Sequence, residues 1–145
     1  MRDLPRQLSA DELAELFEGR TRLVELLAAR EHPLETADDA IVELNEAEKL
    51  EALNAHPAIG ARDLSARSAA EQGADADPVV LTELAYINQV YEEKVGFRFV
   101  VFVNRRPKAE ILEVLRARLQ RTRDEELETA LSELVAIARD RWERG

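Results

Sequence analysis

Helix start signals recur along the whole chain, and they constrain its fold more than any other feature. Ser9-Ala-Asp-Glu12 and Thr122-Arg-Asp-Glu125 are capping boxes, and Asp77-Pro78 places an N-cap residue before a proline at the first helical position. Apolar residues follow each signal at spacings of three and four, the period of an amphipathic helix. The sequence therefore predicts an all-α fold, a single-domain multi-helix bundle over residues 1–145.

Glycine and proline residues predict where several helices begin or end. We expect Gly19 to end the first helix, His32-Pro33 to end the second, and Pro107 to open another at its first position. A residue before proline is pushed out of the helical region, so a further helix is expected to end at His56.

One segment has no helical period. Residues 97–104 read FRFVVFVN, a run of β-branched and aromatic side chains, so we expect residues 97–103 to be extended. A lone extended segment in a helical protein has no neighbouring strand to bond. Its backbone groups are therefore expected to bond to side chains, water or a ligand.

Charge and composition exclude several classes of function. The net charge of −10 repels phosphate backbones and anionic lipid surfaces, so neither nucleic acid nor membrane is an expected partner. The absence of cysteine excludes disulfides and thiolate metal sites. No apolar stretch has the length of a membrane span or the pattern of a secretory signal, so we expect a cytoplasmic protein.

Three positions carry side chains suited to acid–base chemistry or anion binding. His56 follows a helix end whose negative dipole favours a protonated imidazole, suitable for a general acid; alternatively, His-Pro is only a helix stop. Glu71, in Ser68-Ala-Ala-Glu71-Gln72, would orient a ligand or would simply complete a capping box. Arg141 continues the apolar stripe of the last helix, so it either clamps a carboxylate or packs as a structural arginine.

Four blocks, in this order, resemble the 2-oxo-4-hydroxy-4-carboxy-5-ureidoimidazoline (OHCU) decarboxylases of urate degradation. They are NAHPAIG (54–60), SAAEQ (68–72), LAYINQVYEEKVGFRFVVFV (84–103) and VLRARLQRTRDEELETALSELVAIARDRW (114–142). The resemblance implies a carboxy-lyase without cofactor or metal that converts the anionic ureido-imidazoline substrate to (S)-allantoin. It also implies an all-α homodimer with the extended segment near the active site.

The resemblance also implies residue roles. The family's catalytic histidine and glutamate match His56 and Glu71 of this sequence, and its carboxylate-binding arginine matches Arg141. Further substrate contacts are expected at the remaining matched positions, which are Pro57, Ser68, Gln72, and the backbone around Phe99 and Val101. Arg118 matches another family arginine, whose role the sequence leaves open.

Three residues depart from the family's usual pattern: Ala58 after His-Pro, Asp75 in an acidic turn after Gln72, and Val95 at a position that is aromatic in the family. Two alternatives therefore stay open. The chain would act on another small carboxylated ureide, or it would be a non-enzymatic helical interaction module in which His56, Glu71 and Arg141 are structural.

Overall fold

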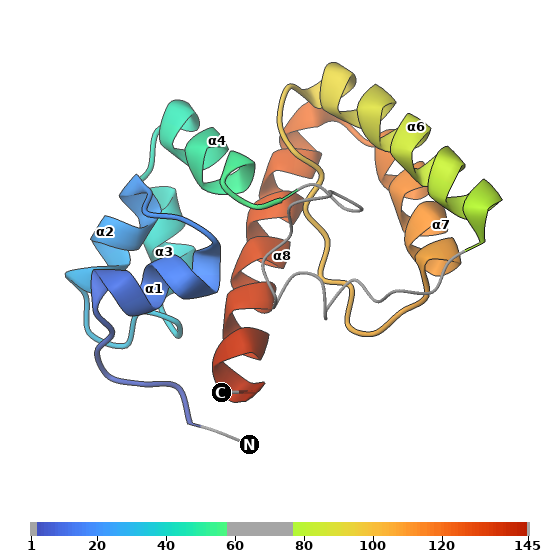
Figure 1. The fold of residues 1–145 in the computed structure, drawn as a ribbon. Coiled ribbons are helices and arrows are strands. Elements are labelled where there is room, and N and C mark those ends of the chain that lie inside the picture. The colour runs from blue at the N-terminus through green and yellow to red at the C-terminus, as the bar shows by residue number, and fades with distance from the viewer. Residues whose placement is uncertain (1–2, 58–76, 145) are drawn as a thin grey trace. The chain divides into compact units, whose positions relative to one another are not determined.

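The computed structural model describes residues 3–57 and 77–144, and within these ranges it contains seven helices and no strand (Figure 1). The all-α prediction is therefore confirmed for the described chain. The chain divides into two compact units, one made of Met1–His56 and Leu131–Gly145 and the other of Pro57–Ala130. No helix in the described ranges combines the length and apolar character needed to cross a membrane.

The first unit is organised around α2 (Arg22–Ala28), which packs against α1 (Ala10–Phe17), α3 (Ala37–Val42) and α4 (Glu46–Asn54). Helix α2 is short, and its stability depends on burying one apolar face. That face consists of Leu23, Val24 and Leu27, all fully buried. The unit also contains the last part of α8, so its core combines the two ends of the sequence.

The predicted cap at Ser9 is confirmed, but the predicted end of this helix is off by one residue. Ser9 Oγ accepts the Glu12 N–H at 3.1 Å, and Glu12 Oε1 accepts the Ser9 N–H at 3.0 Å. Glu18, rather than Gly19, takes the left-handed C-cap conformation, with φ 64°. A Cβ on Gly19 would lie 3.2 Å from the Ala55 Cβ, so close packing explains this glycine.

Two further helix ends differ from the prediction. Helix α2 ends at Ala28, before His32-Pro33, because the following residues form turns in which the Thr36 N–H and Oγ1 both donate to the His32 carbonyl. Helix α4 ends at Asn54, with Ala55 as its cap, so His56 lies just beyond the helix end.

The second unit contains α6 (Pro78–Val95) and α7 (Lys108–Leu119), which pack against each other. The predicted cap at Asp77 is confirmed, since its Oδ1 accepts the Val79 N–H at 2.8 Å. Gly96 ends α6 in the left-handed region, with φ 83°. Pro107 is the N-cap of α7 and not its first helical residue, because its ψ of 154° is extended.

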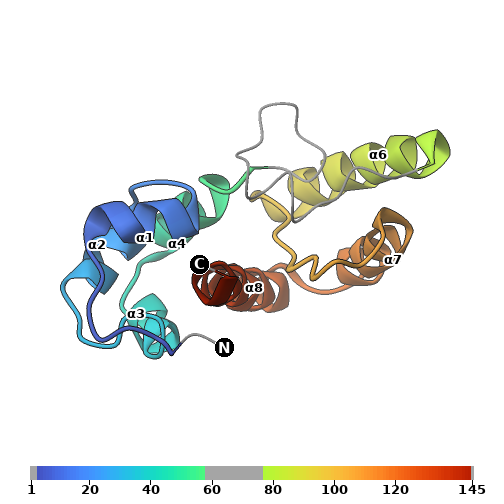
Figure 2. The same cartoon turned by 60° about the horizontal axis from the view of Figure 1, so that its bottom comes forward.

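An extended connection joins α6 to α7, and it is visible in both ribbon views as the yellow-to-orange trace between them (Figure 2). It forms no strand with any described residue, as the sequence predicted. The last helix, α8 (Arg123–Arg144), starts at the predicted Thr122 capping box, where Thr122 Oγ1 accepts the Glu125 N–H at 3.2 Å. The boundary between the two units falls within this helix, between Ala130 and Leu131.

Candidate functional site

His56 and Pro57 follow the C-terminal end of α4. That helix is well defined because Asn45 and Glu48 form a reciprocal capping box at its start. His56 is buried, and its backbone N–H donates to the Leu53 carbonyl at 3.2 Å. His56 thus lies next to the last carbonyl groups of a helix, at the negative end of the helix dipole. Its role as a proton donor stays a prediction.

Arg141 lies in the last turns of α8 and is the largest fully buried side chain of the described residues, with 1% of it exposed. Its Nη1 donates to the Leu16 carbonyl at 3.0 Å, and its Nη2 lies 3.1 Å from Glu18 Oε1. The left-handed turn at Glu18 ends α1 beside this guanidinium. The prediction that Arg141 faces the core is confirmed, whereas substrate binding by Arg141 stays a prediction.

Three predicted site residues, Ser68, Glu71 and Gln72, lie outside the described residues, as do the departures at Ala58 and Asp75. Their roles stay predictions. In the described ranges, no group of three or more histidine, aspartate and glutamate side chains could hold a metal ion.

Arginine side chains bind the carbonyl groups of the extended segment that contains Phe99 and Val101. Arg118 Nη1 donates to the Val100 carbonyl at 2.7 Å. Arg106 Nη2 donates to the Phe102 carbonyl at 2.6 Å, and its Nε donates to the Val103 carbonyl at 3.0 Å. The expectation that side chains replace a β-ladder is confirmed for these three carbonyls.

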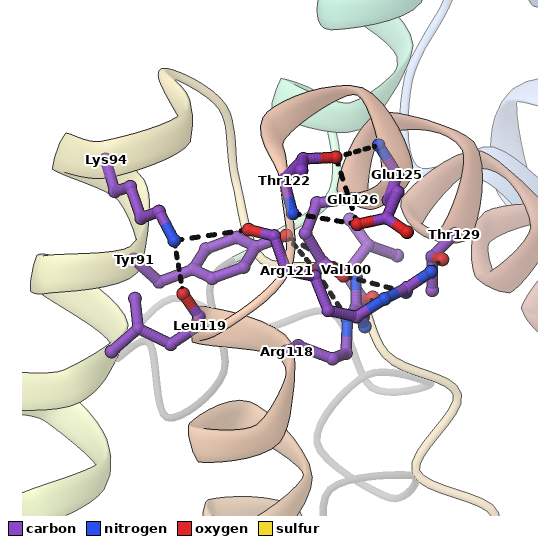
Figure 3. A network of polar contacts seen from close by, with 10 residues as sticks. All are labelled: Tyr91, Lys94, Val100, Arg118, Leu119, Arg121, Thr122, Glu125, Glu126 and Thr129. Atoms are coloured by element: carbon purple, nitrogen blue, oxygen red, sulfur yellow. Dashed lines mark hydrogen bonds and ion pairs between the residues drawn. The ribbon is translucent and has the colours of Figure 1, made fainter.

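Glu126 is the centre of the polar network that holds Arg118 (Figure 3). Its carboxylate is fully buried and accepts hydrogen bonds from Arg118 Nε at 2.7 Å, Tyr91 Oη at 2.6 Å and Arg121 Nη1 at 2.9 Å. The two cations and the hydroxyl donor offset the cost of burying the charge of this carboxylate. Burial, reinforced by the hydrogen bond to Glu126, raises the pKa of Tyr91 well above its usual range.

Sequence reasoning did not single out Glu18 or Glu126, the carboxylate partners of Arg141 and Arg118. The sequence did contain a signal that Glu126 is buried. Glu126 lies four and eight residues before the buried Ala130 and Leu134, so the three share one face of α8. Glu18 had no such signal, since only the left-handed turn brings its carboxylate to Arg141. Arg139, two residues before Arg141, donates its Nε to the Leu34 carbonyl at 2.8 Å.

Comparison with known proteins gives a consistent result. The family model described as OHCU decarboxylase matches residues 2–143. The uric acid degradation bifunctional protein TTL of Arabidopsis thaliana is 35% identical over 105 residues, covering 66% of this chain and 32% of that protein. The 2-oxo-4-hydroxy-4-carboxy-5-ureidoimidazoline decarboxylase of Halalkalicoccus jeotgali is 31% identical over 110 residues, covering 72% of this chain and 62% of that protein.

Both of these relatives are longer than the region matched by this chain, which spans about a third of the first and about three-fifths of the second. The solved structure of an OHCU decarboxylase in the presence of (S)-allantoin has a TM-score of 0.76 and 27% sequence identity. That match covers 90% of this chain and 94% of the solved one, so the fold extends over nearly the whole of both.

Proposed function

Because this chain belongs to the OHCU decarboxylase family, we propose that it converts OHCU to (S)-allantoin in urate degradation. The observation that carries the proposal is the family match over residues 2–143. We extend the proposal to a cytoplasmic homodimer of one catalytic domain over residues 1–145, working without cofactor or metal.

The proposed chemistry needs only side chains of this chain. The bond between a ring carbon and the carboxylate breaks, carbon dioxide leaves, and the electron pair is delocalised by the imidazoline system. His56 then transfers a proton to one face, which accounts for a single enantiomer of allantoin. The position of His56 beyond the end of α4 supports this role, since the helix dipole favours its protonated form.

Substrate binding is assigned to the residues that match the binding positions of the family. Arg141 would bind the carboxylate through its planar guanidinium, a geometry that lysine cannot reproduce. Its burial supports this assignment, since a guanidinium shielded from water interacts more strongly with an anion. Contacts to the hydroxyl, ureido and ring groups are assigned to Pro57, Ser68, Glu71, Gln72 and the backbone of Phe99 and Val101.

The test generates OHCU in situ from urate and follows the circular dichroism of the allantoin formed. The two histidines provide a matched pair, because each precedes a proline and only His32 is exposed. Asn is the replacement at both positions, since His32 has a φ of 52°, which Asn tolerates. We expect His56→Asn to lower kcat roughly a hundredfold or more and His32→Asn to leave it unchanged.

Each outcome has a distinct meaning. Allantoin of a single sign that depends on His56 supports both the reaction and the proton donor. Wild-type protein that yields only spontaneous racemic decay refutes OHCU as the substrate, and other small carboxylated ureides become the compounds to assay. Full turnover by folded His56→Asn would refute the role of His56 alone.

A further inference from the structure

The extended segment has two edges that differ in how their backbone groups are bonded. Phe97, Phe99, Val101 and Val103 are buried whereas Arg98 and Phe102 are partly exposed, an alternation typical of extended backbone. Val100, which is also buried, is the exception to this alternation. In such backbone, the peptide groups of successive residues face opposite edges. Phe99 and Val101 therefore present their N–H and C=O groups to the edge opposite Val100.

Arginines bind two carbonyls on one edge, those of Val100 and Phe102, at 2.7 and 2.6 Å. Arg106 also binds the Val103 carbonyl at 3.0 Å, at the end of the segment. On the other edge, no hydrogen bond of the structure's described residues involves the backbone of Phe99 or Val101. These two residues are only 2% and 8% exposed. Buried peptide groups are nearly always bonded, so this edge is suited to a ligand that carries amides.

Arg118 contacts the segment in two ways at once. Its Nη1 binds the Val100 carbonyl, and its guanidinium carbon lies 4.7 Å from the centre of the Phe99 ring. The same guanidinium donates its Nε to the carboxylate of Glu126, to which Tyr91 and Arg121 also donate (Figure 3). The planar fork of arginine donates to the carboxylate and to the carbonyl in fixed directions.

We propose that Arg118, anchored by Glu126, is a positioning residue that sets the orientation of the Val100 peptide and thereby directs the Phe99 and Val101 backbone groups towards the substrate. This proposal rests on the proposed function. It assigns to Arg118 a role that involves no contact with the reacting atoms. Arg118 acts through the peptide edge that binds the ureido or ring amides.

The experiment compares Arg118→Lys with Arg116→Lys, a control on the same helix. Arg116 is 43% exposed and pairs with Glu83 and Glu113, away from the extended segment. Lysine at 118 keeps the charge but lacks the planar fork whose separate nitrogens reach both the Glu126 carboxylate and the Val100 carbonyl. Two readouts are needed: kcat and KM for OHCU, and the backbone amide resonances of Phe99, Val100 and Val101 in the protein without substrate.

We expect Arg118→Lys to raise KM roughly tenfold with a smaller change in kcat, because the peptide edge binds substrate and transition state alike. The amide resonances of Phe99 and Val101 should shift in this variant and stay in place in Arg116→Lys. A general loss of stability would not produce this split between KM and kcat.

The readouts separate failure of this proposal from failure of the proposed function. Unchanged KM or unmoved resonances in Arg118→Lys overturn the positioning role even if the wild type is a decarboxylase. If the wild type does not act on OHCU, the resonances alone decide whether Arg118 orients this edge. Should Arg118→Lys not fold, Glu126→Asp applies the same test, since its shorter carboxylate draws Arg118 away from Val100.

Discussion

Among the described residues, each unit contains one buried arginine, Arg141 in the first and Arg118 in the second, and the contacts of the two are similar. Each donates Nη1 to a main-chain carbonyl, that of Leu16 at 3.0 Å or that of Val100 at 2.7 Å. Each also pairs with a glutamate, Arg141 with Glu18 and Arg118 with Glu126. Burying a guanidinium is costly without such partners.

The two carboxylates differ in their access to solvent. The Glu126 side chain is 0% exposed and already accepts three donors, whereas that of Glu18 is 14% exposed. The arginines differ in the opposite direction, since 1% of the Arg141 side chain and 7% of the Arg118 side chain are exposed. Arg141 is assigned to substrate binding because it matches the carboxylate-binding arginine of the family. Arg118 is assigned to the support of a backbone segment because it binds the Val100 carbonyl.

The largest expected loss of stability is at the Arg118–Glu126 pair, whose carboxylate is fully buried. Glu126→Gln removes the counterion of Arg118 and Arg121, and breaking a buried pair from one side should lower the free energy of unfolding by about 3 kcal/mol. Denaturant unfolding measures this, with the exposed Glu128→Gln on the same helix as control. A loss no larger than that of the control would mean that the network contributes little to stability.

A smaller loss of stability is expected at the Arg141–Glu18 pair, whose carboxylate is partly exposed. Glu18→Gln should lower the free energy of unfolding by about 2 kcal/mol, because a charge-assisted bond is weakened. It should also lower KM for OHCU, since Glu18 would no longer repel a substrate carboxylate from Arg141. Steady-state kinetics and denaturant unfolding test both effects, with exposed Glu15→Gln as control. A raised KM would mean that Glu18 orients Arg141 and does not compete with substrate.

The smallest effect is expected from Tyr91→Phe, which leaves Glu126 with its two arginine donors and should cost about 1 kcal/mol. Because the pKa of Tyr91 is raised in the folded protein, its neutral form is favoured there. The corresponding stability is fully present below the unfolded tyrosine pKa of about 10 and is lost as pH rises above it. Above this pH, the free energy of unfolding should therefore fall less steeply with rising pH in Tyr91→Phe than in the wild type. Equal slopes would contradict the raised pKa of Tyr91.

The sequence by itself determined which segments are helical and which is not. Caps at Ser9, Asp77 and Thr122 are local, because their side chains bond backbone groups two or three residues away. The extended segment was likewise recognisable from its composition. The periodicity of the last helix also indicated that Arg141 faces the core, since helical period alone decides which residues share a face.

Only the tertiary structure decided what those buried arginines contact. The Leu16 carbonyl that Arg141 binds is 125 residues away in the sequence, and even Val100 is 18 residues from Arg118. Helical periodicity shows that a side chain is buried and carries no information about its partner, because partners come from other elements. The left-handed turn at Glu18 and the arginine contacts of the extended segment depend on packing, so they follow from the fold and not from local sequence.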